Sequence, residues 1–148
     1  MTKTIFRNTS LAALAVAVCG IAFLVLKNKI ISSNPAGIVV QVLAVGLMLW
    51  ARVVFGKRSF HAGANPTEGG LVTHGPYRFL RHPIYAAIIY FVWAGVVSDP
   101  SAEAIAAAVV VALCLIIRML LEEHFLVAAY PEYKEYSRRA KRLIPFLL

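Results

Sequence analysis

Five ionisable side chains at the ends of two apolar segments could carry chemistry in this sequence: Arg81, His82, Arg118, Glu122 and Glu123. Arginine and histidine suit a carboxylate or a phosphate, and glutamate suits an ammonium group or ribose hydroxyls. A ligand with both kinds of group would suit the whole set, and S-adenosylmethionine, a nucleotide and a zwitterionic lipid headgroup all fit this description. The alternative is that the arginine and histidine only anchor a helix at a membrane surface, and that the two glutamates form a solvated helix end.

Two apolar segments joined by a turn must position these side chains. The first runs from Ile84 to Val97, the turn is Ser98-Asp99-Pro100-Ser101, and the second segment ends at Leu121. His82 and Arg118 lie about 17 and 19 residues from the aspartate of the turn, so at the helical rise of ~1.5 Å per residue they are level to within a few ångströms. We therefore predict a hairpin of membrane helices with these side chains at one membrane surface, where ionisable groups are a functional site by default.

The composition predicts that the whole chain lies in a membrane. Its 148 residues are 60% hydrophobic, whereas apolar residues make up about half of an average soluble domain. We predict an all-α integral membrane protein that forms a single domain over residues 1–148. Its predicted parts are four transmembrane helices at about 10–26, 36–55, 83–98 and 102–121, a helical hairpin at about 84–121, a long cytoplasmic loop from Gly56 to Pro83, and an amphipathic interfacial tail at 124–148.

The third apolar segment is too short for a full span. Ile84–Val97 has about 14 residues, or ~21 Å of helix, against a hydrocarbon core of ~30 Å. Either the helix begins earlier in the chain, or the Arg-His pair lies below the membrane surface in a cavity lined by protein. Small residues in the apolar segments, among them Gly37, Gly46 and Gly95, predict close packing between helices.

The basic residues predict the orientation of the chain rather than a nucleic-acid partner. The formal net charge is +8, but the lysines and arginines lie at the ends of apolar segments, where they suit anionic membrane lipids. Most are on the side that carries the amino terminus, the Gly56–Pro83 loop and the tail, whereas the opposite side holds Lys27 and Lys29. The positive-inside rule therefore predicts a cytoplasmic site, in an inner or plasma membrane. Cys19 and Cys114 lie inside apolar segments without a CxxC spacing, so neither a disulfide nor a metal site is predicted.

Several motifs occur in an order that resembles a known enzyme family. The first is Leu71-Val72-Thr73-His74-Gly75-Pro76-Tyr77-Arg78, and the second is Arg81-His82-Pro83-Ile84-Tyr85. The later motifs are, in order, Asp99-Pro100-Ser101, Arg118 with Glu122-Glu123, Leu126, the pair Tyr133 and Tyr136, and Ile144-Pro145-Phe146. This order resembles the isoprenylcysteine carboxyl methyltransferase family and the related membrane phospholipid methyltransferases. The likeness covers about half of the chain, although Tyr130-Pro131 stands where the family usually has Phe-Gly.

The resemblance implies a membrane methyltransferase that binds S-adenosylmethionine at the cytoplasmic end of the hairpin. It implies a cofactor pocket formed by His74, Gly75, Tyr77, Arg81, His82, Pro83, Tyr85, Glu122 and Glu123, with His82, Arg118 and Glu123 as catalytic residues. In this pocket the Arg-His pair, with one of the tyrosines, would hold the methionyl carboxylate. A glutamate would hold the amino group or the ribose, and Arg118 would orient an anionic group of the substrate.

The implied acceptor is a lipid-like or prenylated small molecule, and carboxyl O-methylation of an isoprenylcysteine-like group is the first prediction. A carboxylate is already deprotonated, so positioning and the exclusion of water would supply most of the rate. Phospholipid headgroup N-methylation is the alternative, and it needs a proton acceptor, for which His82, His74 or Glu123 could serve. An NADPH-dependent membrane reductase is a further hypothesis, since sterol reductases resemble the Arg-His-Pro-x-Tyr segment, but the Glu-Glu pair and the short chain disfavour it.

Overall fold

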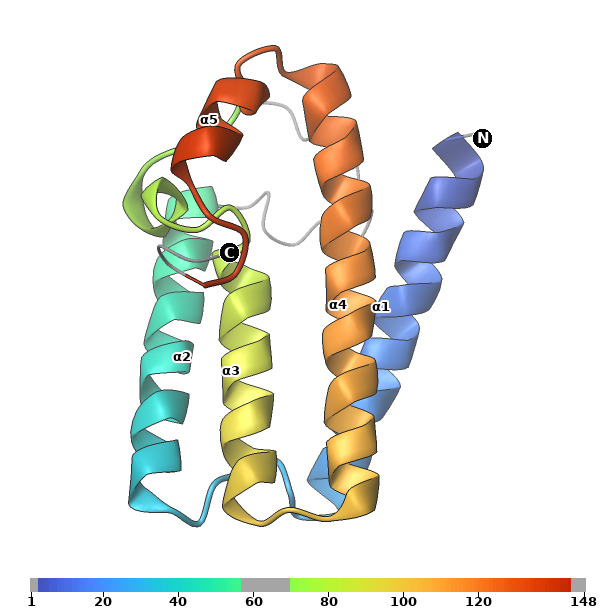
Figure 1. Ribbon diagram of the computed structural model, residues 1–148, viewed down its shortest axis with the longest axis vertical. Helices are drawn as coiled ribbons and strands as arrows, with labels where there is room; N and C mark the ends of the chain where they lie inside the picture. The colour runs from blue at the N-terminus through green and yellow to red at the C-terminus, as the bar shows by residue number, and fades with distance from the viewer. Residues whose placement is uncertain (1–2, 57–69, 145–148) are drawn as a thin grey trace.

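Helices form nearly all of the regular structure in the part of the chain that is described. The computed structural model describes residues 3–56 and 70–144. Its elements in chain order are α1 (Lys3–Leu26), α2 (Pro35–Phe55), the 3-10 turn η2 (Gly75–Arg78), α3 (Pro83–Ser98), α4 (Ala102–Ala129) and α5 (Tyr133–Arg139). The four long helices run alternately in opposite directions, and α5 folds over the end of the bundle at which α3 begins (Figure 1).

The four long helices lie side by side in the order α2, α3, α4, α1. α1 packs along α4, α2 packs along α3, and α3 joins the two pairs through its contact with α4. Buried apolar side chains of α1, α3 and α4 meet in one cluster: Leu24, Val92, Val96, Ala104 and Ala108. The predicted hairpin is therefore confirmed, and it forms the centre of the bundle.

Two of the three glycines expected between closely packed helices lie at close contacts, and the nearest atoms belong to the loop between α1 and α2. A Cβ on Gly95 would lie 2.3 Å from the carbonyl oxygen of Ile30, and a Cβ on Gly37 would lie 2.1 Å from the hydroxyl oxygen of Ser32. A Cβ on Gly46 would meet nothing within 4 Å. The prediction is wrong for Gly46 because it lies on an exposed side of α2.

Three helices are long and apolar enough to cross a membrane, Thr4–Leu26, Pro35–Phe55 and Ala102–Ala129. The chain is therefore an integral membrane protein, but the third of the four predicted spans is shorter than a span requires. α3 has 16 residues, which is about 24 Å of helix against ~30 Å of hydrocarbon. It begins at Pro83, so the explanation that it starts earlier in the chain is wrong. His82 is its N-cap residue, and its side chain is only 6% exposed.

The interfacial tail predicted at 124–148 is wrong in its first part. α4 continues through residues 124–129, where no proline or glycine interrupts it, and α5 starts at Tyr133. Tyr133 and Ala140 are 2% and 0% exposed, so one face of this segment packs against the protein, and its position in the headgroup plane stays a prediction. The first helix also differs from the prediction, because it begins at Lys3 rather than near residue 10.

A short extended segment after α5, residues 140–144 and here called the strap, pairs with the loop that precedes α3. The backbone N–H of Arg81 donates to the carbonyl oxygen of Lys141 at 2.6 Å. The backbone N–H of His82 donates to the carbonyl oxygen of Arg142 at 3.2 Å. These bonds satisfy buried backbone groups that no helix satisfies, and they fix the two residues that precede α3.

The predicted Gly56–Pro83 loop is described from residue 70 onward, and residues 57–69 lie outside the described part, as do the last two residues of the closing Ile-Pro-Phe motif. Gly75 has a positive φ of 60°. A Cβ on it would lie 2.8 Å from Val54 of α2. Both the backbone conformation and this close approach therefore require glycine, and they hold η2 against α2.

Candidate functional site

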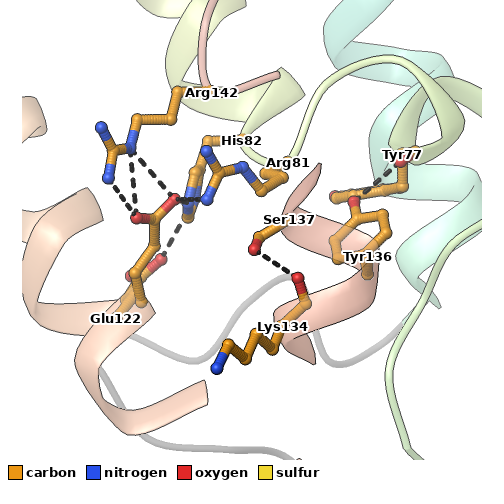
Figure 2. Close-up of polar contacts among 9 residues, drawn as sticks. Tyr77, Arg81, His82, Glu122, Lys134, Tyr136, Ser137 and Arg142 are labelled. Atoms are coloured by element: carbon orange, nitrogen blue, oxygen red, sulfur yellow. Dashed lines mark hydrogen bonds and ion pairs between the residues drawn. The ribbon is translucent and has the colours of Figure 1, made fainter. Parts of the chain in front are cut away.

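Three segments of the chain meet at the carboxylate of Glu123. Its Oε1 lies 2.7 Å from Nη1 of Arg81 and 3.3 Å from Nε2 of His82. Its Oε2 accepts hydrogen bonds from Nη2 and Nε of Arg142 at 3.0 and 3.1 Å. Figure 2 shows Arg81, His82 and Arg142 directed toward one carboxylate. The basic pair and the acidic pair that the hairpin was expected to bring together are thus in direct contact.

The unequal lengths of the hairpin helices explain this contact. α3 begins at Pro83, whereas α4 continues to Ala129, so the carboxylate of Glu123 stands beside the loop that precedes α3. The side chains of Arg81 and Glu123 are 12% and 10% exposed, whereas that of Arg142 is 47% exposed. The contact between Arg81 and Glu123 is therefore largely removed from water, and loss of one partner would leave the other charge buried and uncompensated.

A second group of side chains holds Glu122. The hydroxyl of Tyr85 donates to its Oε1. Nη2 of Arg118 lies 3.5 Å from the same oxygen, and Nδ1 of His82 lies 3.9 Å from Oε2. The rings of His82 and Tyr85 stack at a centroid distance of 5.7 Å. His82 thus lies between the two glutamates, with one of them near each of its ring nitrogens.

Arg118 connects this group to α1. Its Nη1 donates to the backbone carbonyl oxygen and to the hydroxyl of Ser10, at 2.7 and 2.9 Å. Its Nε donates to the hydroxyl of Tyr85 at 3.3 Å. The side chain is 4% exposed, and each of its three guanidinium nitrogens faces a partner on the chain itself. The resemblance led us to expect a guanidinium that orients an anionic group of the substrate; this role stays a prediction, and the contacts of the side chain described above are with the protein itself.

Three tyrosines enclose the loop before α3. Tyr77 is buried and stacks on Phe55 of α2 at a centroid distance of 5.4 Å. Its carbonyl oxygen accepts a hydrogen bond from the hydroxyl of Tyr136 at 2.7 Å (Figure 2). Burial raises the pKa values of Tyr77 and Tyr136, and burial together with the charge of Glu123 raises the pKa of Tyr133 to about 12. All three hydroxyls therefore remain protonated donors at neutral pH.

The other three residues expected in the cofactor pocket differ in their surroundings. His74 is exposed and is the N-cap residue of η2, without a side-chain capping bond. Gly75 serves the backbone turn described above. Pro83 is buried in the first turn of α3, where its missing N–H costs nothing. Two of the three therefore shape the backbone, while His74 lies on the surface of the loop.

Two residues of this constellation are not evident from the sequence. Arg142 is one of several basic residues in the tail. Neighbouring residues of an extended segment point to opposite faces, so only the register of the strap distinguishes Arg142 from Lys141. Ser10 is a single hydroxyl in an apolar helix and carries no signal. Within residues 3–56 and 70–144, no group of three or more His, Cys, Asp or Glu side chains could hold a metal ion.

The sequence pattern of a family described as phospholipid methyltransferase matches residues 33–133. The match confirms the resemblance that the motifs indicate. It includes α2, α3 and every residue expected at the site from the sequence. Ser10 and Arg142 lie outside it.

Three similar proteins each cover part of the chain. The cobalt-zinc-cadmium resistance protein CzcN of Cupriavidus metallidurans is 35% identical over 78 residues, which are 52% of this chain and 36% of that protein. The nickel-cobalt-cadmium resistance protein NccN of Alcaligenes xylosoxydans xylosoxydans is 31% identical over 109 residues, 73% of this chain and 47% of that protein. Protein-S-isoprenylcysteine O-methyltransferase A of Arabidopsis thaliana is 39% identical over 80 residues, 53% of this chain and 41% of that protein. The chain thus spans less than half the length of each of these relatives, and no solved structure matches it.

Proposed function

Because the chain belongs to the phospholipid methyltransferase family, we propose that it is an integral membrane methyltransferase that uses S-adenosylmethionine and methylates a lipid-like acceptor. The observation that carries this proposal is the contact of Glu123 with Arg81 and His82, at 2.7 and 3.3 Å. Acidic and basic groups from distant parts of the chain share one largely buried position at the end of the bundle. A ligand that carries both a carboxylate and an ammonium group needs such a set of partners.

The available donors and acceptors suit the amino-acid part of S-adenosylmethionine. In the described part of the chain, two buried donors, Nε of Arg81 and the hydroxyl of Tyr133, have no hydrogen-bond partner of good geometry, although the hydroxyl lies beside Arg81 and Glu123. A buried donor without an acceptor is costly, and a ligand carboxylate would supply the acceptor. The oxygens of Glu122 and Glu123 would accept hydrogen bonds from the ammonium group or the ribose hydroxyls of the ligand.

Each part of the cluster has a distinct task in this proposal. Arg81 and His82 hold the carboxylate of the ligand, and Tyr85 orients Glu122 through its hydroxyl. When bound, S-adenosylmethionine supplies a methyl group activated by its sulfonium centre. The chain itself aligns the acceptor with that methyl group and limits the access of water, because buried Tyr133 of α5 lies beside Glu123, whose side chain is 10% exposed.

The charge balance of the cluster favours an anionic acceptor. Three arginines, Arg81, Arg118 and Arg142, face two carboxylates, so one positive charge is left over when His82 is neutral. A carboxylate acceptor is attracted by this balance, whereas a zwitterionic phospholipid headgroup carries no net charge for it to attract. We therefore propose carboxyl O-methylation of an isoprenylcysteine-like group, the activity for which the Arabidopsis relative is named. Such an acceptor is already deprotonated, so the ion-paired glutamates need not take up a proton.

The distribution of charge supports a cytoplasmic orientation of the site, in an inner or plasma membrane. At the opposite end of the bundle, Lys27 and Lys29 are paired with Glu103 and Asp99. The site end carries the basic residues of α5 and the strap, which are Lys134, Arg138, Arg139, Lys141 and Arg142. The excess of positive charge at the site end is the pattern expected of a cytoplasmic side.

Binding and labelling with the purified full-length protein in lipid nanodiscs test this function. We expect saturable binding of S-adenosylmethionine and none of NADPH, and binding of NADPH alone would favour a membrane reductase instead. A membrane lipid extract incubated with a radiolabelled methyl donor then identifies the acceptor. A label that mild base releases is a methyl ester, whereas a base-stable label in a phospholipid headgroup indicates N-methylation. His82→Ala is the control that should abolish both signals.

A further inference from the structure

Ser10 of α1 is fully buried, with 0% exposure. Both of its oxygens accept hydrogen bonds from Nη1 of Arg118, the carbonyl oxygen at 2.7 Å and the hydroxyl at 2.9 Å. The preceding residue, Thr9, is exposed. α1 carries none of the family motifs, and Ser10 lies outside the residues that match the family pattern. A helix without motifs therefore contributes one buried polar residue next to a buried guanidinium.

The contacts of Ser10 continue into the proposed methyl-donor site. Nε of Arg118 donates to the hydroxyl of Tyr85 at 3.3 Å, and this hydroxyl donates to Glu122. The ring of Tyr85 stacks on His82 with an angle of 12° between the ring planes. An unbroken series of direct contacts thus leads from α1 to the side chains that are proposed to hold the ligand. Its members are Ser10, Arg118, Tyr85, Glu122 and His82.

Polar contacts between membrane helices can serve only to hold the helices together. The pairing of α1 with α4 does not depend on Ser10, because Ala17, Val111 and Leu115 form a buried apolar cluster between these helices. Gly20 also allows close approach, since a Cβ on it would lie 2.7 Å from Val111. A buried arginine is a costly means of joining two apolar helices. Arg118 lies one helical turn before Glu122 and contacts its carboxylate. Orientation of that carboxylate is therefore a better reason for a buried arginine at this position.

We propose that Ser10 is a positioning residue of the methyl-donor site, which holds the guanidinium of Arg118 and thereby fixes Tyr85 and Glu122. This inference rests on the proposed function. Arg118 is then also a positioning residue, because it acts through Tyr85 and Glu122 instead of touching the substrate. Without the hydroxyl of Ser10, one N–H of Nη1 loses its acceptor and the guanidinium is held less firmly. The loss of this hydrogen bond also lowers the stability of the bundle, but a loss of affinity for the ligand distinguishes a positioning role from a packing role.

The test compares Ser10→Ala with two control variants of the full-length protein in lipid nanodiscs. Thr9→Ala removes the exposed neighbouring hydroxyl, and Gly20→Ala disturbs the packing of α1 on α4 without touching the polar series. We expect Ser10→Ala to bind S-adenosylmethionine about 10-fold more weakly and to lower the midpoint of thermal unfolding by no more than Gly20→Ala does. Thr9→Ala should bind like the wild type, and Gly20→Ala should lower the unfolding midpoint while retaining affinity. Ser10→Thr keeps the hydroxyl and should restore binding.

Three results would overturn the assignment of Ser10 and leave the proposed function intact. The first is wild-type affinity in Ser10→Ala. The second is an equal loss of affinity in Gly20→Ala, which would make the contact one of packing. The third is a Ser10→Thr variant that unfolds at the wild-type midpoint but binds as weakly as Ser10→Ala. If the wild-type protein binds no S-adenosylmethionine, the proposed function fails and this assignment fails with it.

Discussion

Replacement of Glu123 by glutamine removes the charge at the centre of the cluster while keeping the size of the side chain. The amide retains one acceptor oxygen, but its NH₂ group must face one of the basic groups that now contact the carboxylate. The contact with Arg81 is the most sensitive, because both side chains are at most 12% exposed. The contact with Arg142 is less sensitive, because that side chain is 47% exposed and screened by solvent.

The size of the effect follows from these exposures. A hydrogen bond to a charged group contributes about 1.5–3 kcal/mol, whereas an exposed ion pair contributes about 0–1 kcal/mol. The loss at Arg81 therefore dominates, and we expect the free energy of unfolding of Glu123→Gln to fall by about 1.5–3 kcal/mol. A ligand ammonium group that meets residue 123 loses a contact of the same kind. Because ~1.4 kcal/mol is a factor of ten, the affinity for S-adenosylmethionine should fall about 10- to 100-fold.

Titration calorimetry with S-adenosylmethionine and thermal unfolding, both in nanodiscs, measure the two effects of Glu123→Gln. The matched control is Glu135→Gln, which removes the same charge from an exposed pair with Arg139, where the side chains are 67% and 77% exposed. The control should leave both measurements unchanged. If Glu123→Gln binds the ligand as tightly as the wild type, the cluster is only a membrane anchor and the proposed site is refuted.

Three further changes test the packing, the ligand contacts and the topology. Gly95→Ala places a methyl group 2.3 Å from a backbone carbonyl oxygen of the α1–α2 loop and should lower the free energy of unfolding by about 1–3 kcal/mol. The control Gly46→Ala should be neutral or slightly stabilising. Equal unfolding midpoints for the two variants would contradict the close contact. Tyr133→Phe should keep the fold but bind S-adenosylmethionine roughly 10-fold more weakly, and wild-type affinity would exclude the hydroxyl as a ligand donor. Single cysteines in place of Asp99 and Arg138, in a chain without its native cysteines, should react with a membrane-impermeant reagent from opposite sides, and labelling from one side would exclude the alternating arrangement of the helices.

The hairpin and its contact could be predicted because both depend on local signals. The turn contains Pro100 and Ser101, and the hydroxyl of Ser101 accepts a hydrogen bond from the backbone N–H of Ala104, as a helix N-cap does. Pro83 marks the start of α3 in the same way. Once both ends of α3 are defined, the number of residues on each side of the turn predicts that His82 lies level with the end of the second apolar segment.

The contacts of the tail could not be predicted because they depend on the register between distant segments. A helix boundary after Glu123 is suggested by a change in composition, yet the backbone continues as helix to Ala129. The partners of Arg142 follow from the pairing of the strap with the loop before α3, which composition does not encode. The contact of Ser10 with Arg118 joins residues 108 positions apart, and one serine in an apolar helix does not reveal which face is buried.

The shortness of α3 is itself part of the site. α3 and α4 start from one turn, yet 16 and 28 residues give helices of about 24 and 42 Å. Beyond the start of α3 lie the loop, the strap and α5 (Figure 1), and Arg81 of the loop and Arg142 of the strap contact Glu123 of α4. If α3 crossed the whole hydrocarbon core, Arg81 and His82 would emerge at the headgroup level, where exposed ion pairs contribute about 0–1 kcal/mol. A helix that is too short to span the membrane thus keeps these charges out of water, where a buried acidic and basic set can bind a zwitterionic ligand strongly.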